Sequence, residues 1–314
     1  MSLFVEKINN WDDWRKTVQS YQTFAPLLGH IFQKEKLPFA KIESLPLGMV
    51  AVLFKVGGYV IKIYSPPGIN KNSDKDMDAE LFGMKLANVQ GVTAPKLIAY
   101  GVVEDKYHFH YIIMEHINGK RMDELEGSWS YEQKVIFGQN MRKNTDKLNV
   151  PCKNFMPFDV IHYSKNAGGW DDEGFLEAFK AERLAYIANL HINDNDKVLC
   201  HGDLHCHNVL VDDKLDTYII DFASSMYSPP EYEQVYIASA LFCFEKPYME
   251  GYFGSDYRVE DIVDLSMTWL PVHTWGHGTI VGNLGSVAEI TSFDILHKRL
   301  HDFIESEKRK PYCD

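Results

Sequence analysis

The sequence lacks an excess of positive charge and lacks any apolar run long enough to span a membrane. Its 32 Lys and Arg residues stand against 44 Asp and Glu residues, which gives a net charge of −12. Nucleic-acid binding needs clustered positive charge, and a membrane helix needs roughly 20 consecutive apolar residues. The opening residues, MSLFVEKINNWDDW, have no apolar core of a secretory signal. We therefore expect no nucleic-acid partner, no membrane partner and a cytoplasmic location.

Cysteine is also scarce, and the five cysteines are scattered without any CxxC pair. An odd, scattered set argues against a disulfide framework and predicts reduced thiols. No internal repeat or low-complexity segment occurs. The hydrophobic fraction is 45% and the charged fraction 24%, close to globular averages. A chain of 314 residues with this composition predicts one large folded domain or two lobes of ordinary size.

Hydrophobic periodicity divides the chain into a sheet-rich part and a helix-rich part. Apolar runs that flank Gly57-Gly58 predict a β-hairpin. We place a boundary at Asn118-Gly119, so that residues 1–117 form an N-terminal lobe and residues 118–314 a mainly helical C-terminal lobe. The segments that carry this interpretation are a helix over 10–30, strands over 41–64, a helix over 73–88, strands over 95–117 and a short β segment over 208–222.

A short hairpin in the second part gathers polar side chains at its open end. The runs VLV and TYII are separated by the loop DDKLD. If Val211 pairs with Thr217, Asn208 lies opposite Ile220 and Asp221 is its diagonal neighbour, roughly 7–8 Å away or less. An amide oxygen and a carboxylate so placed can bind Mg²⁺, which uses few protein oxygens together with substrate phosphates.

Asp203 enters the same hairpin five residues before Asn208. A carboxylate at that place can accept the proton of a hydroxyl group or orient it for attack. Asp203, Asn208 and Asp221 therefore form a candidate catalytic constellation.

Lys62 interrupts the otherwise apolar strand VIKIY. A buried ammonium is costly unless it is paired, and Glu80 on the next helix is the expected partner. Such a pair would hold the ammonium group on nucleotide phosphates. The alternative is a lysine at a strand edge and a solvated glutamate on a helix.

These motifs, in this order and spacing, resemble the aminoglycoside phosphotransferase family within the protein-kinase-like fold. HGDLHCHN is similar to the HGDxxxxN catalytic loop of that family, and IIDFA to its metal-binding segment. VIKIY with Glu80 resembles the lysine–glutamate pair, and YIIMEHINGK the hinge strand. The resemblance covers most of residues 42–245. It implies an α+β fold with a small antiparallel-sheet lobe, a larger helical lobe and Mg·ATP bound between them.

The resemblance implies a role for each matching position. Asp203 becomes the catalytic base or hydroxyl-orienting carboxylate, and His201 braces its loop. Asn208 and Asp221 become the Mg²⁺ ligands. The implied nucleotide-binding residues are Lys62, Glu80, Gly48 of a phosphate-covering loop with a single glycine, Met114 behind adenine, and the backbone of Glu115 and Ile117. ATP is the expected nucleotide, with GTP left open.

The resemblance implies a small-molecule acceptor, an aminoglycoside-like amino sugar being the first choice. Asp171, Asp172 and Glu173 are candidate carboxylates for a cationic acceptor, with a solvated loop as the alternative. Trp269 and Trp275 could hold an ammonium group, which would suit choline or another amino alcohol, with helix packing as the alternative. The absence of an Ala-Pro-Glu signature and of a long activation loop argues against a protein substrate. The sequence does not give the oligomeric state.

Two further functions compete with the kinase interpretation. One is a zinc-dependent hydrolase, since a dense set of metal-ligating residue types surrounds the catalytic loop: Cys200, His201, Asp203, His205, Cys206 and His207. The other is a nucleotide-binding protein without catalysis. A pure binder would gain thermal stability with Mg·ATP but would transfer no phosphate.

Overall fold

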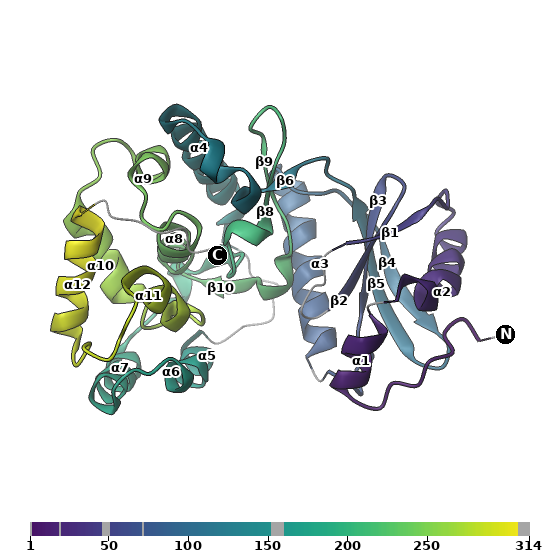
Figure 1. Cartoon of the computed structure of the whole chain (residues 1–314), viewed down its shortest axis with the longest axis horizontal. Helices are drawn as coiled ribbons and strands as arrows, with labels where there is room; N and C mark the ends of the chain where they lie inside the picture. The colour runs from purple at the N-terminus through teal and green to yellow at the C-terminus, as the bar shows by residue number, and fades with distance from the viewer. Residues whose placement is uncertain (1, 19, 46–50, 71, 152–159, 307–314) are drawn as a thin grey trace. The chain divides into compact units, whose positions relative to one another are not determined.

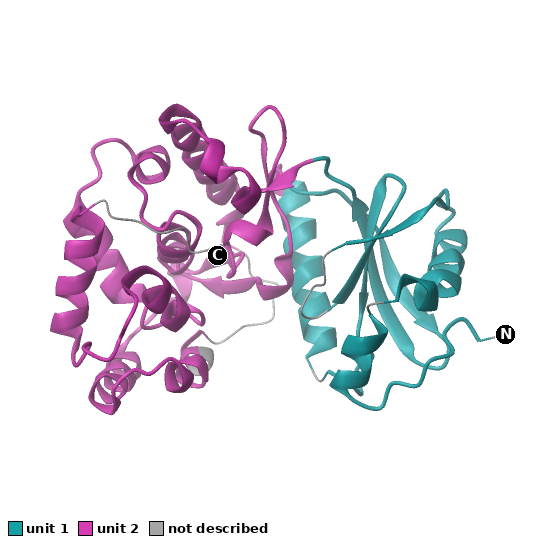
Figure 2. Cartoon of the chain, in the orientation of Figure 1, with its two compact units in different colours: residues 1–89, 94–118 teal, residues 90–93, 119–314 magenta. Residues whose placement is uncertain are grey.

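The computed structural model describes residues 2–18, 20–45, 51–70, 72–151 and 160–306 and is shown in Figure 1. The chain divides into two compact units, coloured separately in Figure 2. Unit 1 comprises residues 1–89 and 94–118, and unit 2 comprises residues 90–93 and 119–314. Among the described residues, no helix is both long and apolar enough to cross a membrane.

Unit 1 contains a five-stranded sheet in the order β1-β2-β3-β5-β4, and all neighbouring strands are antiparallel. The strands are β1 (Ile42–Ser44), β2 (Ala51–Val56), β3 (Tyr59–Tyr64), β4 (Leu97–Glu104) and β5 (His108–Glu115). The predicted hairpin at Gly57-Gly58 is confirmed, because β2 and β3 pair from Ala51↔Tyr64 to Val56↔Tyr59. Gly57 has φ +62°, the left-handed conformation that such a tight turn requires and glycine adopts without strain.

The helices of unit 1 are α1 (Trp11–Thr17), α2 (Tyr21–Lys34) and α3 (Ser73–Gln90). The single helix predicted over residues 10–30 is therefore wrong in detail. The Asn10 side chain caps α1 by accepting the Asp13 N–H, and a turn in which Ser20 N–H bonds the Thr17 carbonyl separates α1 from α2. The spacing of the aromatic residues predicted one continuous amphipathic helix, because that spacing contains no signal for this turn. The buried core of the unit includes Phe4, Phe24, Phe54 and Phe109.

Unit 2 is mainly helical. Its helices are α4 (Tyr131–Leu148), α5 (Val160–Lys165), α6 (Gly169–Asp172), α7 (Glu177–Asn189), α8 (Pro230–Tyr236), α9 (Lys246–Phe253), α10 (Val259–Trp269), α11 (Gly276–Leu284) and α12 (Phe293–Glu305). A π-helical turn over Ile237–Leu241 follows α8.

Two small sheets in unit 2 hold the segments with the candidate catalytic residues. One sheet pairs β7 (Val198–Cys200) with β10 (Met226–Ser228). The other has the order β6-β8-β9, formed by β6 (Lys120–Arg121), β8 (Val209–Val211) and β9 (Thr217–Ile219). The predicted pairing of Val211 with Thr217 is confirmed. The Ile220 N–H donates to the Asn208 carbonyl over 3.0 Å, so the predicted register continues to the open end of the hairpin.

Candidate active site

The segment His201–Asn208, expected to be the catalytic loop and called so below, lies between β7 and β8 and is closed by hydrogen bonds of its own. The Asn208 side-chain amide Nδ2 donates to the Asp203 carbonyl oxygen over 2.8 Å and lies 3.3 Å from Asp203 Oδ2. A carbonyl oxygen only accepts, so the amide nitrogen of Asn208 faces Asp203. Its Oδ1 is therefore the atom left for another partner. The hairpin and the loop together bring Asp203 and Asn208 into contact, as the spacing predicted.

The buried His201 ring joins the catalytic loop to the end of β9. Its Nε2 lies 2.9 Å from the Ile220 carbonyl, and its Nδ1 lies 3.3 Å from the Asp203 N–H. The carbonyl requires a proton on Nε2, and the N–H requires a bare Nδ1, so both bonds fit the neutral imidazole. Burial lowers the pKa of His201 in agreement with that state. His201 thus positions the loop, and its one ring proton is engaged by the Ile220 carbonyl.

Gly202 allows the loop to turn sharply immediately before Asp203. Its φ is +82°, and a Cβ atom at this position would lie 2.4 Å from the Ser224 carbonyl oxygen. Only glycine combines that conformation with so close an approach. These two constraints explain why glycine occupies the middle position of the HGD motif.

Asp221 follows β9 in the left-handed conformation, with φ 63° and ψ 68°. Asn208 and Asp221 lie at the same end of the hairpin, because the N–H of Ile220, the residue before Asp221, donates to the Asn208 carbonyl. An amide oxygen and a carboxylate are hard oxygen donors, the kind that Mg²⁺ prefers over imidazole or thiolate. The donor set therefore fits Mg²⁺.

A buried carboxylate on α8, that of Glu233, binds the backbone of the catalytic loop. The sequence analysis did not predict this contact. Glu233 is 1% exposed, and its Oε2 accepts the backbone N–H of His201 over 2.5 Å. Burial raises the pKa of Glu233 to about 7. The sequence signal was a glutamate between Tyr232 and Val235 in the stretch SPPEYEQVYIA that follows the metal-binding segment, but nothing in that stretch indicates which backbone atom it binds.

In unit 1, the predicted pair of Lys62 and Glu80 is confirmed. The Lys62 ammonium lies 2.5 Å and 2.7 Å from the two carboxylate oxygens of Glu80, and both side chains are almost fully buried. The Tyr64 hydroxyl, which the sequence reasoning missed, donates to Glu80 Oε2 over 2.6 Å. Lys62 and Tyr64 lie two apart on β3 and so share a face of the sheet, which explains why both reach one carboxylate on α3.

The segment expected to bind adenine lies at the end of β5. Met114 is 6% exposed and pairs with Val60. The pairing of β3 with β5 ends at Tyr59↔Glu115, so Ile117 lies beyond the last pair of that ladder. Gly48 of the expected phosphate-covering loop lies outside the described residues.

The side chains predicted to bind the acceptor differ in their exposure to solvent. Asp171, Asp172 and Glu173 are all exposed, although Asp171 forms an ion pair with Lys180 at 3.0 Å. Trp275 is 45% exposed, whereas Trp269 is 8% exposed and packs edge-on against Tyr232. Trp269 therefore has little surface to offer a ligand.

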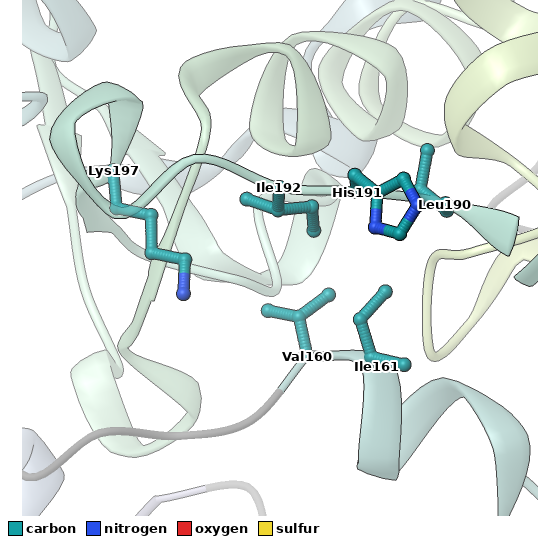
Figure 3. A pocket seen from close by; sticks show the side chains of 6 residues that line it. All are labelled: Val160, Ile161, Leu190, His191, Ile192 and Lys197. Carbon is teal, nitrogen blue, oxygen red and sulfur yellow. The ribbon is translucent and has the colours of Figure 1, made fainter. Parts of the chain in front are cut away.

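A pocket of about 330 Å³ occurs elsewhere in unit 2 (Figure 3). Its lining is mainly apolar and consists of Val160, Ile161, Leu190, His191, Ile192 and Lys197. The Lys197 ammonium forms an ion pair with Asp194 at 2.6 Å. None of the residues predicted for catalysis, nucleotide or acceptor lines this pocket.

The two cysteines near the catalytic loop, Cys200 and Cys206, differ in oxidation state. Cys200 is a free, buried thiol whose pKa burial raises well above its usual range. Cys206 is disulfide-bonded, so the expectation that the thiols are all reduced is wrong at this position. Spacing along the sequence does not show which cysteines approach to bonding distance.

Comparison with known protein families identifies the family of this chain. The family model described as "Phosphotransferase enzyme family" matches residues 49–261. The chain belongs to this phosphotransferase family. The resemblance in the motifs is therefore confirmed, and the chain is a phosphotransferase. Its family membership argues against the zinc-dependent hydrolase.

Solved structures similar to this phosphotransferase support the same fold. An aminoglycoside phosphotransferase in complex with GDP and kanamycin has 14% identity and a TM-score of 0.58, over 90% of this chain and 95% of that one. A spectinomycin phosphotransferase in complex with ADP and spectinomycin has 14% identity and a TM-score of 0.53, over 90% and 97%. A choline/ethanolamine kinase family protein from Mesorhizobium loti has 16% identity and a TM-score of 0.50, over 87% and 89%.

These likenesses, together with the two units, confirm the predicted α+β kinase-like fold. A search of curated proteins finds no match.

Proposed function

We propose that this phosphotransferase transfers the γ-phosphoryl group of Mg·ATP to a hydroxyl group of a cationic small molecule, an aminoglycoside-like amino sugar being the preferred acceptor. The contact of Asn208 Nδ2 with Asp203 carries this proposal. It leaves Oδ1 of Asn208 as the atom available to a metal ion and holds the Asn208 side chain beside Asp203.

The proposed chemistry is an in-line displacement. The acceptor oxygen forms a bond to the γ-phosphorus as the bond from that phosphorus to the β,γ-bridging oxygen breaks, and ADP leaves. Asp203 orients the acceptor hydroxyl and takes its proton. Lys62, held by Glu80, binds the phosphates of the nucleotide, and Met114, Glu115 and Ile117 bind its base.

The proposed metal ligands are Asn208 and Asp221. Mg²⁺, when bound, offsets negative charge on the phosphates. The protein contributes mainly position and fixed charge, because phosphoryl transfer asks for little covalent chemistry from the enzyme.

The acceptor class is supported by charge and by similar structures. A net charge of −12 and the exposed carboxylates of Asp171, Asp172 and Glu173 favour a cationic acceptor. Two of the similar structures are complexes with kanamycin or spectinomycin. The second candidate acceptor is choline or another amino alcohol, favoured by the similar choline/ethanolamine kinase family protein and by the exposed Trp275 ring.

The test is phosphate transfer from Mg·ATP to a panel of aminoglycosides, amino alcohols and sugars, with the mass of each acceptor as the readout. A parallel series with Mg·GTP decides the nucleotide. We expect a phosphorylated aminoglycoside that is absent with Asp203→Asn. Transfer only to choline or a related compound would overturn the preferred acceptor. Binding of Mg·ATP with no transfer to any member would favour the nucleotide-binding protein without catalysis.

A further inference from the structure

The segment between β5 and β6 contains the only Asn-Gly pair of the sequence, Asn118-Gly119. Residues 116–119 join the end of β5 at Glu115 to the start of β6 at Lys120 and belong to neither sheet. The chain passes from unit 1 to unit 2 at the peptide bond between Asn118 and Gly119. The proposed phosphoryl transfer uses the backbone of Ile117, just before this bond, and gives Asn118 no role.

The two groups that meet in this pair are not held by other parts of the described chain. Asn118 is exposed, and its side chain forms no hydrogen bond with any residue that the structure describes. The Gly119 N–H likewise donates no hydrogen bond to the described residues. The side-chain amide carbon of Asn118 and the backbone nitrogen of Gly119 therefore lie next to each other along the chain without competing partners.

An asparagine that precedes a glycine can lose its amide nitrogen through a five-membered ring. The Gly119 nitrogen, once it has lost its proton, forms a bond to Cγ of Asn118, and the side-chain nitrogen takes up a proton and leaves as ammonia. Water then adds to one of the two ring carbonyls. Opening of the ring gives either aspartate or isoaspartate, in which the main chain runs through Cβ and Cγ. Glycine favours ring closure because no Cβ hinders the approach of its nitrogen.

We propose that Asn118 is a site of spontaneous deamidation and that its isoaspartate product weakens nucleotide binding. Isoaspartate adds one carbon atom to the main chain in a segment that is held on both sides. The His116 N–H donates to the Gly58 carbonyl over 3.0 Å, and Lys120 pairs with Val211. Residues 117–119 must absorb the added atom, and the Ile117 amide is expected to bind adenine. The weakening rests on that proposed role of Ile117; the deamidation does not.

The deamidation is tested on the full chain, incubated without nucleotide at mildly alkaline pH and, in parallel, at mildly acidic pH. Peptide mass mapping locates each gain of about one dalton, and an isoaspartate-specific methyltransferase measures the isoaspartate. We expect the gain first in the peptide that contains Asn118, and faster at alkaline pH. It should be absent from that peptide in Asn118→Gln, because glutamine would need a less favourable six-membered ring. Asn195, which is exposed and precedes an aspartate, is the internal control. Equal rates at Asn118 and Asn195 would overturn the site.

The consequence is measured by calorimetry as the affinity for Mg·ATP before and after incubation. The isoaspartate form should bind about tenfold more weakly, the effect of losing about one hydrogen bond. Fresh Asn118→Asp has the added charge without the added main-chain atom and should bind as the fresh unchanged protein does, and Asn118→Gln should keep its affinity through the incubation. Equal affinity of the fresh and isoaspartate forms would overturn the weakening. A fresh protein that binds no Mg·ATP would refute the proposed function and the weakening with it, whereas the mass map would still decide the deamidation.

Discussion

The Glu233 carboxylate accepts the backbone N–H of His201 over 2.5 Å, which links helix α8 to the catalytic loop. The His201 ring in turn contacts the carbonyl of Ile220, the residue before Asp221. One buried carboxylate therefore supports both the loop that carries Asp203 and the end of the strand that carries Asp221. Positions of catalytic groups depend on such supporting contacts.

This relationship predicts a pH-dependent stability. Burial raises the pKa of Glu233 from 4.5 to about 7, so the folded chain binds this proton more tightly than the unfolded chain. The stability that Glu233 contributes is therefore full below about pH 4.5 and is lost as the pH rises through about 7. The neighbouring Cys200 and Tyr252 do not titrate in this window, because burial raises their pKa values well above it.

Glu233→Gln removes this titration while its side-chain oxygen can still accept from His201. The free energy of unfolding, measured by denaturant titration from pH 4.5 to 8, should fall by about 3 kcal/mol more in the unchanged protein than in the variant. Parallel curves for the two proteins would contradict the assignment of a titrating Glu233.

Asp203→Asn should lower turnover by at least about a hundredfold, because the variant can no longer accept the acceptor proton. Nucleotide affinity should stay near its original value, since the amide keeps the size of the carboxylate. Single-turnover transfer and nucleotide titration separate the two effects. Asp213→Asn, at an exposed carboxylate in the turn of the same hairpin, is the matched control. Near-normal turnover in Asp203→Asn would refute the role of this residue.

Asp221→Ala should abolish the Mg²⁺-dependent part of nucleotide binding, because Asn208 alone offers a single neutral oxygen. The measurement is nucleotide affinity by calorimetry with and without Mg²⁺. Asp213→Ala should retain the full dependence on Mg²⁺. A dependence on Mg²⁺ that persists in Asp221→Ala would move the metal site elsewhere.

Lys62→Met should destabilise the chain by about 3–5 kcal/mol, because it leaves the buried Glu80 carboxylate without its cation. The double variant Lys62→Met/Glu80→Leu should recover much of this loss but should bind nucleotide no better. Lys55→Met is the control, since Lys55 lies on the neighbouring strand, is partly exposed and is 3.9 Å from Glu43. An exposed pair of this kind contributes at most about 1 kcal/mol. Equal melting shifts for Lys55→Met and Lys62→Met would argue against a buried pair.

Gly202→Ala should lower both stability and turnover. The variant would hold an alanine at φ +82° with its Cβ 2.4 Å from the Ser224 carbonyl. The left-handed conformation alone costs about 1–2 kcal/mol, and relieving the contact would displace Asp203. Gly168→Ala serves as the control, since Gly168 has φ −69° and an added Cβ would meet nothing within 4 Å. Thermal unfolding and transfer rate of the two variants give the comparison.

Local patterns of residues were sufficient to predict several features of this protein. The turn at Gly57-Gly58, the register of Val211 with Thr217 and the pairing of Lys62 with Glu80 were predicted and are confirmed. Alternation fixes which face of a strand is buried, and a buried ammonium requires an acidic partner.

Contacts that join distant segments of the chain could not be predicted from such patterns. Glu233 and His201 are 32 residues apart, and neither helix period nor strand alternation shows that a carboxylate on α8 meets a backbone N–H of the catalytic loop. The same holds for Asp123, which lies far from His207 in the sequence but 3.5 Å from it in space, and for the disulfide-bonded state of Cys206. Local pattern specifies an element and its faces, whereas packing of the whole chain decides which faces meet.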